Sequence, residues 1–275
     1  MSPAQPTPRA EPSRIVVVVA DGLRADVAAQ AMGYVAALLE AGQARATRHD
    51  SGLPSLSRPL YATLLTGRWP LAHGILSNQQ VQACGATLFD DAHAAGLRSA
   101  IVAYHWFCEL LGGPAFAPLS DRRRLPEGRG IVAASWYFED DYPDSHVIAD
   151  AEALRLAHEP DLLFVHPMGP DDRGHRFGGE SDEYRMVARR LDMLLALAVP
   201  RWHGAGYDVL LTSDHGMGRD RMHGGTGEAE RSVPLVWMPR PGPGVAALLE
   251  LALPAAQTGL RDFLQRQRQA RRVAG

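Results

Sequence analysis

The chain has 275 residues, 46% of them hydrophobic and 21% charged, which is enough for a substantial core in one large domain or two small ones. The formal net charge is −3 and the basic residues are arginines scattered among acidic ones, which argues against a surface made to bind a nucleic-acid polymer. The two cysteines, Cys84 and Cys108, do not suggest a disulfide scaffold and are too few for a cysteine-based zinc site.

Residues 1–13 are rich in Pro and Ala and lack a long apolar stretch, so we expect a short disordered leader before a single domain over residues 14–275. The apolar run 15–20 is too short for a signal-peptide core or a membrane span, and Asp21 follows it at once. These absences favour a cytoplasmic protein that does not bind a membrane. They leave the oligomeric state open.

The hydrophobic pattern predicts strands and helices that alternate along the chain. A buried strand over residues 15–20 comes first, followed by helices over 26–39, 57–65 and 88–95 and a strand over 99–103. Then come a helix over 147–157, a strand over 162–165, a helix over 183–198, strands over 209–212 and 233–237, and a helical tail from Val245 that Pro254 interrupts. This order favours an α/β fold with a mostly parallel central β-sheet sandwiched by helices.

One segment departs from the alternation. Residues 112–130 contain three prolines, several glycines and the run Arg122-Arg123-Arg124, a composition typical of an exposed excursion. We expect this excursion to belong to a small cap or insertion over about residues 105–145.

Aspartates and histidines follow three of the predicted strands. Ligands bind beyond the carboxyl ends of the strands in such sheets, so these side chains should meet there. Carboxylate oxygen and imidazole nitrogen both bind Zn²⁺, and a mixed set accommodates two ions side by side. Asp21 taken alone would equally fit the N-cap of a helix. The aspartates and histidines of these motifs are Asp21, Asp171, Asp172, His175, Asp214, His215 and His223.

Three serines precede the predicted helix 57–65. Ser51, Ser55 and Ser57 each fit a helix cap, and a hydroxyl at a helix N-terminus could also be a nucleophile whose pKa is lowered by a metal and the helix dipole. Periodicity does not choose among them.

The stretch from Ser57 to Arg68, with Pro70 and His73-Gly74 after it, resembles the nucleophile segment of the alkaline phosphatase superfamily. It is most similar to the type I phosphodiesterase/nucleotide pyrophosphatase branch, whose Thr or Ser nucleophile stands ten residues before the Gly of a Thr-Gly pair. Thr66-Gly67 therefore places the nucleophile at Ser57. The later motifs Asp-x-x-Gly-His-x-x-Gly, Ser-Asp-His-Gly-Met and His-Gly are matched in order by residues 171–178, 213–217 and 223–224.

The resemblance implies an alkaline-phosphatase-like catalytic domain with two divalent metal ions, usually Zn²⁺, with Mn²⁺ as an alternative. It implies hydrolysis of a phosphodiester or phosphoanhydride bond in a small molecule or nucleotide, through a phosphoserine intermediate on Ser57. Asp171, His175 and His223 would hold one ion. Asp21, Asp214 and His215 would hold the other, near Ser57.

Asn78 extends the match, since it lies 21 residues after Ser57. In the diesterase branch an Asn at this offset donates to a non-bridging phosphoryl oxygen, and its neutral amide suits a centre with one negative charge fewer than a monoester. Monoesterases of the superfamily tend to have Arg or Lys there. Without the resemblance, Asn78 would be a turn residue.

Two other functions fit the same motifs. Phosphonoacetate hydrolase resembles this branch and cleaves a carbon–phosphorus bond, so a phosphonate substrate is one alternative. A non-catalytic metal-binding homologue is the other. The chain departs from the branch in having Ser where Thr is more common and in having Arg58 directly after it.

The chain is short for the superfamily, so the cap that selects the leaving group must be small. Its candidate substrate contacts are aromatic, although such side chains equally pack in a core; they are His105, Trp106, Trp136 and Tyr137. For His166, a contact to a metal ligand and simple packing in a loop are both open. We expect Asp172 to face solvent or to cap a helix.

Overall fold

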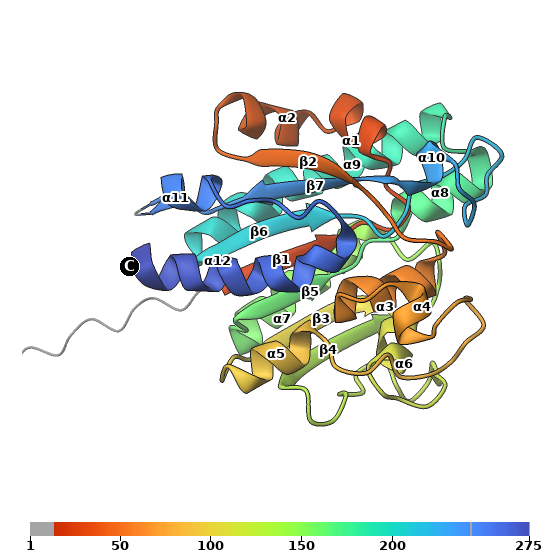
Figure 1. The fold of residues 1–275 in the computed structure, drawn as a ribbon, viewed down its shortest axis with the longest axis horizontal. Helices are drawn as coiled ribbons and strands as arrows, with labels where there is room; N and C mark the ends of the chain where they lie inside the picture. Colours follow the sequence, from red (N-terminus) through yellow and green to blue (C-terminus); the bar gives the residue numbers. More distant parts are fainter. Residues whose placement is uncertain (1–13, 243, 275) are drawn as a thin grey trace, which may run out of the picture.

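The computed structural model of the protein describes residues 14–242 and 244–274, so the expected leader lies outside the described residues. A seven-stranded sheet of order β2-β7-β6-β1-β5-β3-β4 forms the centre of the molecule (Figure 1). All pairs are parallel except the two that β7 makes, with β6 and β2. The strands are β1 (Arg14–Val19), β2 (Arg45–Asp50), β3 (Ser99–Tyr104), β4 (Ile131–Tyr137), β5 (Leu162–Val165), β6 (Tyr207–Thr212) and β7 (Ser232–Met238).

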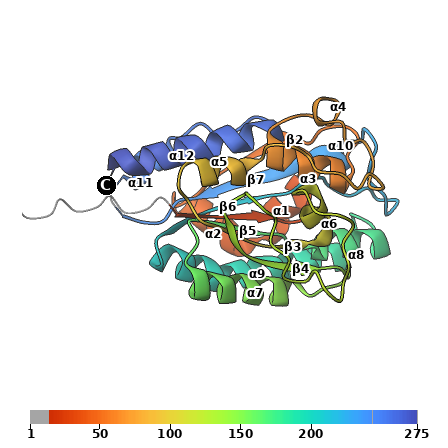
Figure 2. The ribbon, with the colours of Figure 1, turned by 90° about the horizontal axis from the view of Figure 1, so that it is seen from below.

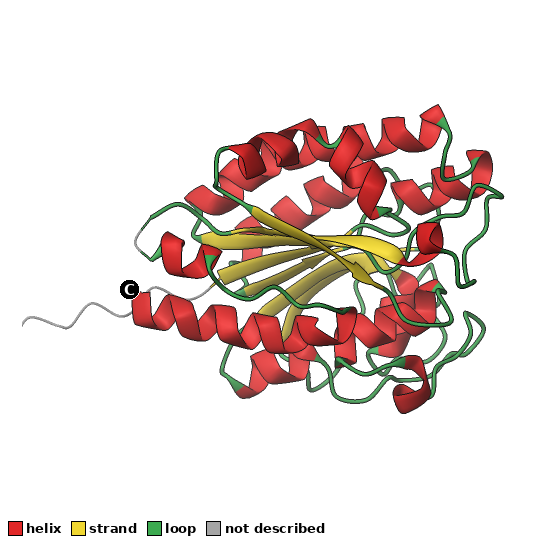
Figure 3. Ribbon diagram, turned by 45° about the horizontal axis from the view of Figure 1, so that its top comes forward, coloured by secondary structure: helices red, strands yellow, loops and turns green. Residues whose placement is uncertain are grey.

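Helices cover both faces of the sheet, as Figures 2 and 3 show. Alternate side chains of β1 point to opposite faces: Val16 and Val18 pack toward one group of helices, and Val17 and Val19 toward the other. The first group is α1 (Ala25–Ala31), α2 (Gly33–Glu40), α7 (Asp144–His158) and α9 (Asp182–Gly204). The second is α3 (Ser57–Thr66), α5 (Leu88–Ala94), α6 (His105–Leu110) and α12 (Leu260–Ala274). This confirms the predicted α/β class with a mostly parallel sheet.

The predicted helix over 26–39 is two helices, because the chain leaves helical geometry at Met32. The break is stabilised from a distance: the N–H groups of Tyr34 and Val35 donate to the carboxylate of Asp192 on α9, at 2.7 and 3.1 Å. That carboxylate satisfies the free amides at the start of α2. No local signal could have indicated a partner more than 150 residues away in the sequence.

Strand β2 was not predicted. Five of its six side chains are exposed, because it pairs only with β7 at the edge of the sheet, so it lacks the apolar alternation of a half-buried strand. The other helices of the described residues are α8 (Gly169–Phe177), the short helices α4 (Pro70–His73), α10 (Glu228–Arg231) and α11 (Val245–Leu249), and a 3-10 turn, η1 (Gln257–Gly259). Of the described helices, none is both long and apolar enough to cross a membrane.

The segment 105–145 differs from the expected insertion in one respect. Its residues 131–137 are β4, an edge strand of the central sheet, and α6 packs on the same sheet. The mostly exposed excursion is confined to the loop between α6 and β4. The apolar run at 131–137 explains the difference, since it fits a sheet strand buried on both faces.

Asp144, the first residue of α7, gives the fold a pH dependence. One carboxylate oxygen accepts from the Gly169 N–H at 3.0 Å, while Oδ2 is buried with no hydrogen-bond partner among the described residues. Burial raises the pKa of Asp144 from 3.8 to about 6. The folded state therefore holds the carboxyl proton of Asp144 more tightly than the unfolded chain does. The stability of the fold falls as pH rises between these two pKa values.

We expect Asp144→Asn to stabilise the protein more at pH 8 than at pH 5, by about 1 to 2 kcal/mol, since the amide cannot ionise and keeps an acceptor for Gly169. Urea unfolding at the two pH values measures this difference. A stabilisation that is equal at both values would contradict the raised pKa.

Candidate active site

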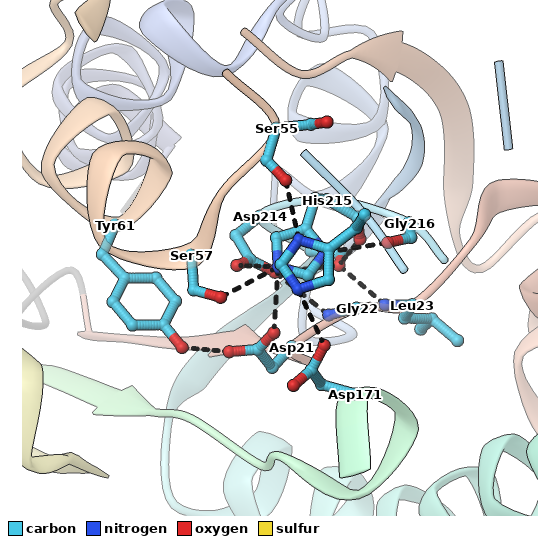
Figure 4. A network of polar contacts seen from close by, with 12 residues as sticks. Asp21, Gly22, Leu23, Ser55, Ser57, Tyr61, Asp171, Asp214, His215 and Gly216 are labelled. Carbon is cyan, nitrogen blue, oxygen red and sulfur yellow. Dashed lines mark hydrogen bonds and ion pairs between the residues drawn. The ribbon is translucent and has the colours of Figure 1, made fainter. Parts of the chain in front are cut away.

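The candidate ligands meet at the carboxyl ends of the three central strands. Asp21 follows β1, and Asp214 and His215 follow the neighbouring β6. Asp171 lies in α8, which begins shortly after β5 on the other side of β1. Figure 4 shows Asp21, Asp171 and Asp214 around His215, with Ser57 approaching from α3.

Asp21, Asp214 and His215 form a fully buried group. The Nε2 atom of His215 is 3.4 Å from Asp21 Oδ1 and 3.2 Å from Asp214 Oδ2. Neither of these oxygens has a hydrogen-bond partner among the described residues, although both are buried. Buried carboxylate oxygens without donors indicate a missing positive charge.

Asp171, His175 and His223 converge in the same way. Helix α8 places Asp171 and His175 on one face, four residues apart, and the two Nε2 atoms of His175 and His223 lie 3.5 and 3.6 Å from Asp171 Oδ1. The two Nε2 atoms are 3.2 Å apart. His215 joins this group as well, since its ring stacks on that of His223 with centroids 3.7 Å apart. The His175 side chain is 40% exposed, so the site opens to solvent on this side.

Main-chain carbonyls define which ring nitrogens carry protons. The Nδ1 atoms of His175, His215 and His223 face the carbonyl oxygens of Arg221, Gly216 and Ser55 at 2.8–2.9 Å. Nδ1–H donates to each carbonyl, so in the neutral imidazole Nε2 presents a lone pair to the carboxylates. Burial lowers the pKa of His223 to about 4 and that of His215 well below its usual range, so these two rings are neutral.

The pKa values of the candidate carboxylate ligands are shifted in the opposite direction. Burial raises the pKa of Asp21 to about 7, and it raises the pKa values of Asp171 and Asp214 well above their usual range. Nitrogen lone pairs and carboxylate oxygens that face one another repel, and divalent cations would turn this repulsion into coordination. The residues therefore fit two adjacent cation sites with nitrogen and oxygen ligands.

The three candidate serines have different surroundings. Ser57 Oγ lies 3.0 Å from Nε2 of His215, at the N-terminus of α3. Ser55 instead donates from Oγ to the Gly225 carbonyl at 2.8 Å, and Ser51 Oγ is buried without a partner among the described residues. Of the three, Ser57 is the one whose hydroxyl contacts the side chain of a candidate ligand.

Asp21 is held by side chains that sequence reasoning missed or left open. The hydroxyl of Tyr61, one turn after Ser57 on α3, donates to Asp21 Oδ2, and His166 Nε2 is 3.3 Å from the same oxygen. His166 Nδ1 is in turn 2.8 Å from the hydroxyl of Tyr137. Asp21 Oδ2 is thus occupied and Oδ1 is left for a cation. Because His166 contacts a candidate metal ligand, the structure favours that contact over simple packing in a loop.

The segment after α11 also reaches the site. Gln257 is fully buried, and its side-chain amide donates to the carbonyls of Ser213, at 3.0 Å, and Asp214. It supports the loop that carries two candidate ligands. Nothing in the sequence around Gln257 indicates this, because its partners lie more than 40 residues earlier.

Gly22 lets the loop after β1 come close to Asp171 at the start of α8. Its φ is +67°, its N–H donates to Asp214 Oδ1 at 3.1 Å, and an added Cβ would lie 2.9 Å from the Cα atom of Asp171. We expect Gly22→Ala to lower the free energy of unfolding by about 2 to 4 kcal/mol, from backbone strain plus overpacking, and to weaken metal binding.

Gly42→Ala is the matched control, because Gly42 has φ +66° and nothing within 4 Å of an added Cβ. It should show the strain alone, in urea unfolding, and leave metal affinity unchanged. Equal effects of the two substitutions on metal affinity would contradict the role assigned to the close approach at Asp171.

Asn78 lies beside Ser57. Its Oδ1 accepts from the Arg58 N–H at 3.0 Å, so its side-chain NH₂ remains the donor for another group. A phosphoryl oxygen is an acceptor and would require this NH₂ group as its donor.

The structure corrects part of the predicted substrate pocket. Trp136 and Tyr137 are buried in β4, and Trp136 donates from its indole nitrogen to the Arg124 carbonyl at 2.7 Å, so neither side chain is open to a substrate. His105 and Trp106 are partly exposed on α6 and stay candidates. Asp172 was expected to face solvent or to cap a helix. It is instead buried in the first turn of α8, whose N-cap is Met168, and Arg176 on the next turn pairs with its carboxylate at 2.8 Å.

A mostly parallel sheet with this group of aspartates and histidines at its carboxyl edge defines the class of the alkaline phosphatase superfamily. Within it the chain belongs to the type I phosphodiesterase/nucleotide pyrophosphatase family, whose family model matches residues 15–255.

Known relatives agree on the fold. Mouse ectonucleotide pyrophosphatase/phosphodiesterase family member 1 is 27% identical over 181 residues, which are 60% of this chain and 19% of that protein. The murine ectonucleotide pyrophosphatase/phosphodiesterase 5, in an inactive form in complex with AMP, superposes with a TM-score of 0.58 at 18% identity, over 75% of this chain and 57% of that one. Phosphonoacetate hydrolase from Sinorhizobium meliloti, in complex with phosphonoacetate, gives a TM-score of 0.55 at 21% identity, over 74% and 56%. The chain thus spans a fifth to three fifths of these proteins.

Proposed function

We propose that this chain is a metal-dependent hydrolase of phosphodiester or phosphoanhydride bonds in small molecules or nucleotides, with a phosphoserine intermediate on Ser57. The observation that carries the proposal is the contact of Ser57 Oγ with His215 Nε2, at 3.0 Å, inside a group of buried ligand atoms that lack donors. Family membership supports the same chemistry.

The chain's own residues divide the work. Asp21, Asp214 and His215 would hold one cation, and Asp171, His175 and His223 the other. When bound, these ions, Zn²⁺ or Mn²⁺, would lower the pKa of the Ser57 hydroxyl and neutralise charge on the phosphoryl oxygens.

Ser57 Oγ attacks phosphorus as the leaving oxygen departs on the opposite side, and water later hydrolyses the phosphoserine. Ser57 is the first residue of α3, and the side chain of the N-cap residue Leu56 makes no hydrogen bond to the helix, so the Ser57 N–H is available to a phosphoryl oxygen. The NH₂ group of Asn78 donates to another non-bridging oxygen. Tyr61 orients Asp21 throughout.

A substrate panel on Zn²⁺- and Mn²⁺-loaded protein tests the proposal. We expect turnover of bis(p-nitrophenyl) phosphate and of a dinucleotide to exceed that of p-nitrophenyl phosphate, because a neutral Asn suits a singly charged phosphoryl centre. Faster turnover of the monoester would contradict the diesterase assignment.

The similarity to phosphonoacetate hydrolase supports a second candidate, cleavage of a carbon–phosphorus bond. Release of phosphate from phosphonoacetate, with no turnover of diesters, would favour it. Metal analysis addresses the non-catalytic alternative: a chain that retains less than about one ion after reconstitution would be a degenerate relative.

A further inference from the structure

An arginine with a buried ionic partner follows Ser57 directly. Arg58 is 2% exposed, and its Nη1 donates to Glu109 Oε2 on α6 at 2.6 Å. Its guanidinium also lies over the Trp106 ring, 4.6 Å from the centroid. A buried ion pair costs desolvation free energy that its attraction does not reliably return, so its presence beside a nucleophile calls for a role other than stability.

The same arginine holds Asn78 at two points. The Arg58 N–H donates to Asn78 Oδ1 at 3.0 Å, and Arg58 Nε donates to the Asn78 main-chain carbonyl at 2.7 Å. Side chain and main chain of Asn78 are thus both fixed relative to the first turn of α3. The side-chain oxygen is turned toward Arg58, which leaves the NH₂ group to point elsewhere.

Glu109 is itself fixed. Its Oε1 accepts from the Phe116 N–H at 2.9 Å and lies 3.5 Å from His105 Nδ1. Burial alone would raise the pKa of Glu109, but the nearby His105 side chain and the hydrogen bonds from Phe116 and Arg58 lower it to about 2, so the carboxylate is ionised and Arg58 is neutralised. The chain of contacts runs from the loop after α6, through Glu109 and Arg58, to Asn78.

We propose that Arg58 and Glu109 are a positioning pair, which aims the NH₂ group of Asn78 at the phosphoryl oxygen beside Ser57 without touching the substrate. The inference rests on the proposed function for its kinetic consequence. The pair preorganises a donor that would otherwise turn freely at the half-buried Asn78, and donors of this kind act through fixed orientation.

A double-mutant cycle on the full metal-loaded protein tests the pair. We expect Glu109→Gln to lower kcat for bis(p-nitrophenyl) phosphate about 10- to 100-fold with little change in KM, less than the loss from deleting a donor outright. In the Asn78→Ala background, Glu109→Gln should have almost no further effect, because the group it positions is gone. Losses that multiply in the double variant would overturn the proposal.

Arg58→Lys gives a second route if Glu109→Gln is poorly folded, because lysine keeps the charge but cannot reproduce the directed Nε–H. Asp208→Asn is the matched control. Asp208 is a buried partner of Arg271 near the start of β6, away from the ligand end of that strand. Asp208→Asn should lower the free energy of unfolding and leave kcat unchanged. If it lowered kcat as much as Glu109→Gln does, the loss in Glu109→Gln would be explained by general destabilisation, and the positioning role would be overturned.

A readout independent of turnover separates this proposal from the function. The side-chain NH₂ of Asn78, assigned by its disappearance in Asn78→Ala, should show a high ¹⁵N heteronuclear NOE in the wild type and a reduced one in Glu109→Gln. An unchanged NOE overturns the positioning role. An inactive wild type with this NMR result would refute the proposed function and leave the pair standing.

Discussion

Ser57→Ala is expected to lower kcat toward a phosphodiester by at least about 1,000-fold, because the variant has no oxygen to form the bond to phosphorus. The stability cost should be small. The Ser57 hydroxyl makes one side-chain contact, with His215 Nε2, and the helix needs nothing more from it. Metal content should therefore match the wild type, and only turnover should be lost.

Ser55→Ala and Ser57→Thr serve as controls for this loss. Ser55 has the same side chain two residues away, but its Oγ bonds only the main chain of Gly224 and Gly225. Because Ser55→Ala keeps the carbonyl that accepts from His223, kcat should fall by no more than about tenfold. Ser57→Thr keeps a hydroxyl and should retain turnover. Rapid quenching with labelled substrate should find the phosphoryl group on the Ser57 peptide. A Ser57→Ala variant with most of its activity would refute the nucleophile assignment.

The sequence was sufficient for five of the seven strands, for the motifs and for their convergence, whereas β2 and β4 were missed. Three of the candidate ligands come after strongly apolar runs, and parallel strands bring their carboxyl ends together whatever the loops do. Asp21, Asp171 and Asp214 could be predicted as neighbours for that reason. The choice of Ser57 over Ser51 and Ser55 could not come from periodicity. It came from the resemblance, and the distance to His215 now supports it independently.

The supporting residues could not be predicted because their partners are remote in the chain. Tyr61 reaches Asp21, Gln257 reaches Ser213, and Glu109 reaches Arg58, each across a turn or layer that only the fold brings together. Trp136 illustrates the opposite error: an aromatic residue near a predicted site is buried, because its segment is a sheet strand. Side-chain type predicted which residues meet at the strand ends, and it failed to predict the burial of Trp136 on β4.

Asp214→Asn should have opposite effects on function and on the stability of the metal-free protein. Asn keeps an oxygen that accepts from the Gly22 N–H at 3.1 Å. It replaces Oδ2, which lies 3.2 Å from His215 Nε2 and has no hydrogen-bond partner among the described residues, with a donor. Buried carboxylates that repel one another destabilise the apo protein, so removing one charge should raise its melting temperature.

With metal bound, the wild type should melt at a higher temperature than Asp214→Asn. Ions that bind only the folded wild type, at about 100 times their Kd, add about 2.7 kcal/mol to its free energy of unfolding and raise its melting temperature by roughly 5 to 10 °C. The Asp214→Asn variant should lose most of this shift, and its kcat should fall on the order of 1,000-fold. Thermal unfolding of the wild type and of Asp214→Asn, each with chelator and with Zn²⁺, shows whether the order of the two melting temperatures reverses. An Asp214→Asn protein that melts below the wild type with chelator, or gains as much from Zn²⁺, would mean that Asp214 is a structural carboxylate rather than a ligand.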